Sequence, residues 1–160
     1  MDKKKVAELP DLSATLVEVE APVLELDELW SCVLKKVRKC WIWIALCRQT
    51  RQVVAFVVGD RSAKTCRRLW QAIPKAFRQA QCSTDFWEAY SKVLPEAQHT
   101  AVGKESGQTA HVERWNLTLR QRLARFVRRT LSFSKSSVMH EACLRLFIHH
   151  YNCSHALTLM

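Results

Sequence analysis

The sequence predicts an α/β domain built on a mixed sheet, and two observations support this class. The 160-residue chain is 48% hydrophobic with only three glycines and four prolines, a composition typical of one folded domain with a core rather than of a disordered chain. Apolar runs of strand length also alternate with segments of helical spacing, which indicates that strands and helices build one core together.

Three strands are expected first. The segment 22–33, "PVLELDELWSCV", alternates between apolar and polar residues, as in a strand. The segments 40–47, "CWIWIALC", and 52–60, "QVVAFVVGD", follow on either side of the polar turn "RQTR". Both are apolar at almost every position, which is expected of central strands covered on both faces.

The rest of the chain alternates between helices and strands. Helical spacing over 61–77 is stopped by Pro74, because proline cannot continue a helix. The remaining expected elements are a short strand at 80–84, a helix at 86–94, a fifth strand at 97–102, a long helix from about 110 and a last helix at 136–152. This order is that of a ribonuclease-H-like fold, a five-stranded mixed sheet with flanking helices, although strand order alone is weak evidence.

The charge of the chain points to a polyanionic partner. A formal net charge of +10 favours nucleic acid first and an anionic membrane surface second, with a merely soluble basic protein as the alternative. The charged amino-terminal stretch is not followed by an apolar segment, as a secretory signal would be. No run reaches the ~18 apolar residues of a membrane span. We therefore expect a cytosolic protein.

The cysteines and histidines do not form a recognisable metal site. The seven cysteines contain no Cys-x-x-Cys pair, and their position in apolar runs indicates reduced core thiols. The segment "FIHHYNCSHA" does bring potential ligands together in sequence, namely His149, His150, Cys153 and His155. We do not predict a metal site there, because adjacent ligands on a helix point in different directions.

Two aspartates lie where the first and fourth expected strands meet. In the first strand, Glu25 and Asp27 share one face, while Leu24, Leu26 and Glu28 take the other. Asp85 follows the fourth strand, which neighbours the first in a ribonuclease-H-like sheet. Two close carboxylates repel each other, and a divalent cation is the usual remedy. The alternatives are a surface aspartate on an edge strand for Asp27 and a helix N-cap for Asp85.

A third acid, Glu113, begins the long basic segment "HVERWNLTLRQRLARFVRRTLSFSKS" at 111–136. At about 100° per residue, a helix places Glu113 in one strip with Asn116, Arg120 and Ala124. The apolar flank consists of Val112, Leu119, Leu123 and Phe126, and the basic arc consists of Arg114, Arg122, Arg125, Arg128 and Arg129. Glu113 therefore stands on the border between the core and a face for solvent or DNA.

Two further alternatives concern this helix. Glu113 could simply complement the helix dipole in the first turn, with the arginines forming a solvated face. Trp115 could stack on an unpaired base, although its angle of about 200° favours the edge of the core.

Three stretches carry a resemblance to a known family. They are "ELDELWSCV" around Asp27, "STDFWEAY" around Asp85 and "ERWNLTLRQRLARFVRRTLSFSKS" from Glu113. From about residue 22 to about 155 the chain resembles the catalytic part of insertion-sequence-one family transposases, a group of DDE transposases. The resemblance implies that Asp27, Asp85 and Glu113 hold two Mg²⁺ ions, which Mn²⁺ can replace. It also implies that Arg120 matches the basic residue that these enzymes carry two turns after their glutamate. With the basic arc, the expected DNA contacts are Arg114, Arg120, Arg122, Arg125, Arg128, Arg129 and Lys135.

The implied reaction is nicking of DNA at the 3′ ends of the element, followed by attack of the freed 3′-hydroxyl on target DNA. We expect a leader or remnant of an upstream region at 1–21, the catalytic domain at 22–155 and a tail at 156–160. Family members carry a zinc-binding and helix-turn-helix region ahead of this domain, which we expect to be absent here. The expected partners are element ends, target DNA and further copies of the chain, in the cytoplasm of a bacterium at the nucleoid.

Two other functions remain open at this point. A ribonuclease-H-like nuclease or resolvase would use the same three acids without strand transfer, and only the "LRQR…SFSKS" pattern argues against it. A catalytically incompetent DNA-binding fragment would use the basic face alone.

Overall fold

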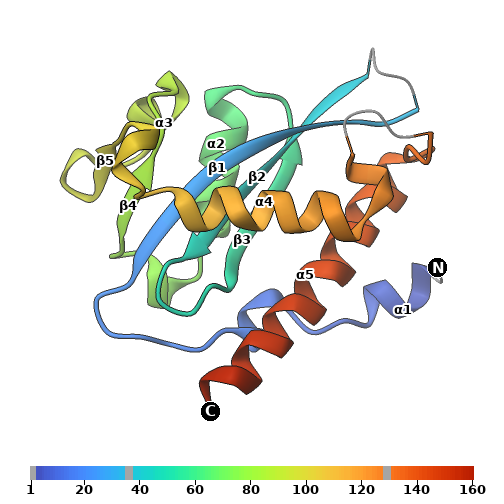
Figure 1. Ribbon diagram of the computed structural model, residues 1–160, viewed down its shortest axis with the longest axis horizontal. Helices are drawn as coiled ribbons and strands as arrows, with labels where there is room; N and C mark the ends of the chain where they lie inside the picture. The colour runs from blue at the N-terminus through green and yellow to red at the C-terminus, as the bar shows by residue number, and fades with distance from the viewer. Residues whose placement is uncertain (1–2, 35–37, 128–130) are drawn as a thin grey trace.

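The computed structural model describes residues 3–34, 38–127 and 131–160 and centres on a five-stranded sheet (Figure 1). The strands are β1 (Val23–Cys32), β2 (Lys39–Cys47), β3 (Val53–Gly59), β4 (Gln81–Thr84) and β5 (His99–Ala101). Their order is β3-β2-β1-β4-β5; β1 to β3 form an antiparallel meander, and β4 and β5 run parallel to β1. These features confirm the α/β class and the ribonuclease-H-like arrangement.

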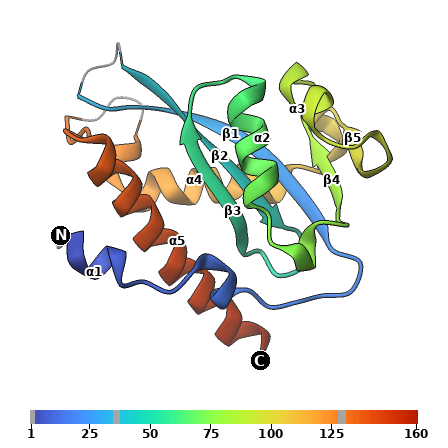
Figure 2. The same cartoon turned by 180° about the vertical axis from the view of Figure 1, so that it is seen from behind.

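Helices cover both faces of the sheet. Figures 1 and 2 show α4 and α5 on one face and α2 on the other, with α3 beside β4. The bounds are α1 Lys3–Ala7, α2 Ala63–Ala72, α3 Glu88–Val93, α4 Ala110–Arg122 and α5 Ser137–Leu159. Short 3-10 turns lie at Leu12–Thr15, Lys75–Phe77, Glu96–Gln98, Lys104–Ser106 and Ala124–Phe126. No helix in the described ranges is both long and apolar enough to cross a membrane.

The sheet separates two apolar cores. One packs β1 and β2 residues such as Leu26 and Trp43 against α2 and α3, and the other packs Ile42 and Ile44 against α4 and α5. Trp43, Ile42 and Ile44 are each 0% exposed, although successive side chains of a strand point to opposite faces. Burial on both faces therefore explains why β2 is apolar at almost every position.

The ends of α2 and α5 follow local signals. Ser62 caps α2 by accepting a hydrogen bond from the Thr65 amide, and Ser136 caps α5 in the same way, which satisfies amides that have no partner inside the helix. At its other end α2 stops at Ala72, two residues before Pro74, which confirms the predicted stop. Ile73 is extended there, because proline disfavours a helical conformation of the residue before it.

The predicted length of the helix after residue 110 was wrong. α4 ends at Arg122 because Leu123 takes an extended conformation, with φ −123° and ψ 103°. The following turn carries Phe126 into the core, where its ring lies 4.6 Å from that of His140. Ala124 and Arg125 therefore do not continue the predicted strip and arc. The predicted DNA contacts Arg128 and Arg129 lie outside the described residues.

Part of the predicted leader packs against the last helix, and most of the predicted tail belongs to that helix. α1 and the turn at Leu12–Thr15 pack against α5, and the Arg145 guanidinium donates to the carbonyl oxygen of Leu9 at 3.5 Å. α5 itself runs on to Leu159, beyond the predicted end at 152. The domain boundaries remain a prediction.

One edge of β1 is only partly paired, and this opens the site. β4 pairs with Val23–Glu25 of β1. On the side away from β2, the next pairing among the described residues is the bridge between Val33 and Ser134, where the Leu34 amide donates to the Ser134 carbonyl oxygen at 2.7 Å. Between these pairings, residues 26–30 of β1 line the pocket that contains the predicted acids.

Candidate active site

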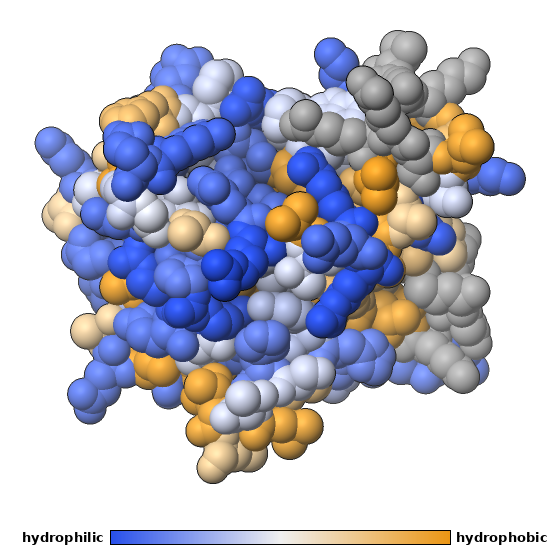
Figure 3. All heavy atoms as spheres, viewed as in Figure 1, coloured by the Kyte–Doolittle hydropathy of each residue, from blue (hydrophilic) through white to orange (hydrophobic). Residues whose placement is uncertain are grey.

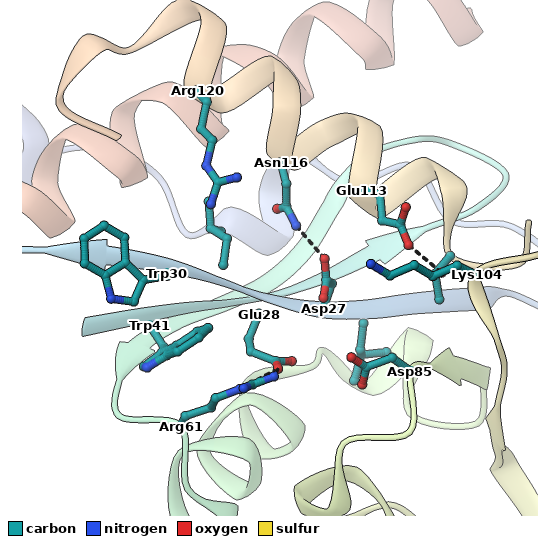
Figure 4. Close-up of a pocket in the computed structure, with 13 residues that line it drawn as sticks. Asp27, Glu28, Trp30, Trp41, Arg61, Asp85, Lys104, Glu113, Asn116 and Arg120 are labelled. Carbon is teal, nitrogen blue, oxygen red and sulfur yellow. Dashed lines mark hydrogen bonds and ion pairs between the residues drawn. The ribbon is translucent and has the colours of Figure 1, made fainter. Parts of the chain in front are cut away.

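The three predicted acids line one pocket of about 470 Å³ where β1 and β4 diverge. Asp27 comes from β1, Asp85 from the end of β4 and Glu113 from the first turn of α4 (Figure 4). The other residues that line the pocket are Leu26, Glu28, Leu29, Trp30, Trp41, Arg61, Lys104, Thr109, Asn116 and Arg120.

Asp27 lies on the central strand of the sheet, so the alternative of an edge-strand surface residue is wrong. Its Oδ2 accepts a hydrogen bond from Asn116 Nδ2 at 2.7 Å. The pKa of Asp27 is raised to about 7, chiefly by burial and also by the negative charges of Glu28, Asp85 and Glu113. A cation bound beside these carboxylates would offset their mutual repulsion.

Asp85 is held just ahead of α3. Its Oδ1 accepts a hydrogen bond from the Trp87 amide at 2.9 Å, while Trp87 itself is the N-cap residue of α3 and makes no side-chain cap. Asp85 thus shapes the turn that enters the helix without being its N-cap. This turn keeps the carboxylate at the end of β4, beside the pocket (Figure 4).

Glu113 is exposed in the first turn of α4, where its Oε1 accepts a hydrogen bond from Thr109 Oγ1 at 3.0 Å. Figure 4 shows Glu113, Asn116 and Arg120 extending from the same side of α4 toward β1. The predicted strip is therefore confirmed for these three residues. A position in the first turn also suits the helix dipole, so the two interpretations of Glu113 are compatible.

A buried glutamate that the sequence did not single out anchors α4 to β1. Glu25 is 0% exposed, and its Oε2 accepts hydrogen bonds from the amides of His111 (2.9 Å) and Val112 (3.0 Å). Its Oε1 contacts Arg48 Nε at 2.8 Å and His111 Nδ1 at 2.7 Å. Glu25, two residues before Asp27 on β1, therefore caps the amino-terminal end of α4, the helix that carries Glu113. Its only signal in the sequence was an acid on the same strand face as Asp27.

Glu28 is buried beside Asp27 but is engaged elsewhere. Arg61 donates to Glu28 Oε1 through Nε (2.9 Å) and Nη2 (2.7 Å), and the Tyr90 hydroxyl donates to Oε2 at 2.6 Å. Burial raises the pKa of Glu28, and the hydrogen bonds from Tyr90 and Arg61 oppose that shift. Because both carboxylate oxygens have protein donors, Glu28 serves to hold Arg61 in the pocket.

The predicted basic residues are divided between two sides of α4. Arg120 lines the acidic pocket, together with Lys104. Arg114 and Arg122 are exposed, and Arg114 lines a separate hollow with Arg51. Figure 3 shows strongly hydrophilic side chains on the face that α4 crosses.

Two other predicted DNA contacts lie beyond α4. Lys135 is exposed. Arg125 is half-buried. The pKa of His140 is lowered to about 4, chiefly by burial and to a smaller extent by the charge of Arg125. Arg125 thus lies nearer to the core than the helical arc implied.

The sequence-based interpretation of Trp115 is settled by its burial. Trp115 is 2% exposed and packs its ring against Phe147 and Tyr151 of α5. It is a core residue and cannot stack on DNA.

Carboxylate oxygens are suitable ligands for a hard cation, but the described residues do not form a complete metal-binding site. Across 3–34, 38–127 and 131–160, no three His, Cys, Asp or Glu side chains are placed to hold one metal ion. In the carboxy-terminal cluster, Cys153 Sγ is 3.9 Å from His149 Nδ1, and the His149 and His150 rings are perpendicular. All seven cysteines are free thiols.

Comparisons with known proteins find relatives over most of the chain. Residues 21–153 match the family described as IS1 transposase. The Insertion element iso-IS1n protein InsB of Shigella dysenteriae is 39% identical over 128 residues, which cover 80% of this chain and 95% of that protein. The Insertion element IS1 protein InsB of Shigella flexneri is 39% identical over 131 residues, covering 82% and 95%. The Insertion element IS1 4 protein InsB of Escherichia coli K12 is 37% identical, covering 82% and 74%. The chain therefore belongs to the IS1 family of DDE transposases.

Proposed function

We propose that this chain is the catalytic domain of a transposase that cuts and joins DNA at the pocket between β1, β4 and α4. The observation that carries the proposal is that Asp27, Asp85 and Glu113, from three separate elements, line one pocket in a member of a transposase family. The charges of Asp85 and Glu113 both act on Asp27, which supports a shared role for the three acids.

The three carboxylates would hold two Mg²⁺ ions, and Mn²⁺ would be accepted in their place. An all-oxygen donor set suits these hard cations, with water and phosphate oxygens completing the ligand shell. When bound, the ions activate the attacking water or hydroxyl and stabilise the leaving oxygen of the phosphodiester.

The other residues of the pocket would orient the acids and hold the DNA. Asn116 fixes the Asp27 carboxylate through the 2.7 Å hydrogen bond. Lys104 and Arg120 are placed to offset the negative charge of the reacting phosphate.

The proposed reaction has two steps. In the first, water attacks the phosphorus at the 3′ end of the element, the bond to the 3′ oxygen breaks, and a free 3′-hydroxyl is released. In the second, that hydroxyl attacks a phosphodiester of target DNA and displaces its 3′ oxygen. The partners would therefore be the element ends, target DNA and further copies of this chain bound to the DNA, at the bacterial nucleoid.

The decisive test is Glu113→Gln in a plasmid-nicking assay with Mg²⁺. Glutamine keeps the size of the side chain but removes the charge that helps to hold a cation. We expect cleavage to fall by roughly a thousandfold or more, while DNA binding persists because one repulsive charge has gone. Folding should hardly change, since Glu113 is exposed.

Two nearby exposed acids provide matched controls. Glu105→Gln and Glu88→Gln make the same chemical change outside the pocket lining and should retain most activity; the surface ion pair of Glu88 with Lys92 is worth little. Normal cleavage by Glu113→Gln together with an inactive Glu105→Gln would show that the third ligand is misassigned.

The same assay separates the remaining alternatives. Nicked plasmid without strand-transfer products would indicate a nuclease or resolvase. DNA binding without metal-dependent nicking would indicate a DNA-binding fragment.

A further inference from the structure

Two tryptophans line the same pocket as the three acids. Trp30 of β1 and Trp41 of β2 are directly opposite each other in the antiparallel pairing, so their side chains share one face of the sheet. Both are partly exposed, whereas Trp43, the next tryptophan on that face, is 0% exposed. The aromatic surface of this face therefore continues from the core into the pocket.

Trp30 does not belong to either apolar core. The ring and cation contacts among the described residues do not include it. A large indole in a pocket lined by carboxylates, lysine and arginine exposes apolar area where a packed core would bury it. Such a ring suits a ligand that presents a flat aromatic face.

The Trp41 ring is held in place by a cation–π contact with Arg61. The Arg61 guanidinium carbon lies 4.6 Å from the Trp41 ring centre and 4.1 Å from that of Trp87, so it is placed between two indoles. Two hydrogen bonds to the Glu28 carboxylate hold it there. Because these contacts are already made, Trp41 loses little side-chain freedom when a ligand binds.

The aromatic pair lies close enough to the acids to act on the same DNA strand. Trp30 follows Asp27 by three residues on β1, which is about 10 Å along a strand. The two side chains leave opposite faces of β1, yet they line one pocket because β4 pairs with β1 only as far as Glu25. Figure 4 shows Asp27, Trp30 and Trp41 around this one pocket, so a DNA strand bound across this edge of β1 would pass both the acid and the aromatic pair.

We propose that Trp30 and Trp41 form a stacking surface for an unpaired nucleobase of the DNA strand that is bound at the acids. The proposal rests on the proposed function and names how the site holds its substrate. Stacking tolerates any base, since every base has an aromatic face. The surface therefore binds a DNA strand that is unpaired near the cleaved bond, and it does so without sequence specificity.

The test measures the affinity of the full chain for a short single-stranded oligonucleotide that contains 2-aminopurine, with Trp30→Leu, Trp30→Phe and Trp70→Leu as variants. Trp70→Leu is the matched control, because Trp70 is a partly buried tryptophan of α2 outside the pocket lining. We expect Trp30→Leu to raise Kd by at least about fivefold. Trp30→Phe should recover most of the affinity, and Trp70→Leu should change it by less than twofold.

An abasic oligonucleotide series then separates stacking from general damage. Removing one base at the stacking position should weaken binding to the wild-type chain, and Trp30→Leu should cause no further loss on that oligonucleotide, because the two changes remove the same contact. Equal affinities of Trp30→Leu and Trp30→Phe for the oligonucleotide would overturn the proposal. So would a Trp30→Leu variant with altered self-association and unchanged DNA affinity, because Trp30 would then contact a second copy of the chain.

The plasmid-nicking assay keeps this proposal distinct from the catalytic one. If the wild-type chain nicks DNA and Trp30→Leu binds oligonucleotide normally, only the stacking proposal fails. If the chain never nicks DNA but the Trp30 series behaves as expected, the catalytic proposal fails and the aromatic surface stands as a DNA-binding site.

Discussion

Replacing Glu25 by glutamine should weaken the whole domain and misplace Glu113. The carboxylate is 0% exposed, and its two oxygens each serve two nitrogen atoms: Oε2 accepts from the amides of His111 and Val112, and Oε1 contacts Arg48 Nε and His111 Nδ1. A glutamine has one carbonyl oxygen. Whichever way its amide is turned, the NH₂ group faces one of these two nitrogen pairs.

The cost follows from these contacts. Each hydrogen bond to a charged group contributes ~1.5–3 kcal/mol. Two of them are lost, so the free energy of unfolding would decrease by about 3–6 kcal/mol if nothing replaced them. Arg48 is 30% exposed, so water replaces part of its loss, and we expect a decrease of about 3 kcal/mol in the free energy of unfolding. For a domain of this size that corresponds to a Tm lower by roughly 6–12 °C.

Thermal unfolding by circular dichroism checks the magnitude, with Glu96→Gln as the control because Glu96 is an exposed glutamate. Cleavage is then measured at a temperature at which both proteins are folded. It should fall by about tenfold or more, since a misplacement of about 1 Å costs ~10²-fold. A Tm within about 1 °C of the wild type would refute the idea that Glu25 anchors α4.

Two further predictions concern pH and salt. His140 is buried between Ser31 and Ser134, and burial together with the charge of Arg125 lowers its pKa from 6.5 to about 4. Between these pH values the unfolded chain binds more protons than the folded one, so the free energy of unfolding should decrease by about 3 kcal/mol as the pH falls from 6.5 to 4. His140→Asn should show a smaller loss of Tm over this range. DNA binding should weaken with salt, and the slope of log K against log salt should be about −4 to −5 if five basic side chains contact phosphates. Arg122→Gln should reduce the magnitude of this slope by about 1 for all DNA sequences alike. An affinity that does not change with salt would contradict a basic DNA-binding face.

The sequence by itself determined which segments form strands and helices and which residues share a face, but not where the last two helices end. Alternation in β1 placed Glu25 and Asp27 on one face of the strand, and the helical period grouped Glu113, Asn116 and Arg120. These predictions succeeded because the periods of strands and helices are set by local backbone geometry. The resemblance to a family then indicated that the separate acids meet.

Only the tertiary structure decided how the site is built around those acids. The cap on α4 joins Glu25 to an amide 86 positions away in the chain, and Arg61 lies between Trp41 and Trp87, which come from different parts of the sequence. The end of α4 at Leu123, which lets Phe126 reach His140, also depends on packing. Such contacts have no local period, because their partners are brought together by the burial of distant apolar residues and by the need to satisfy buried polar groups.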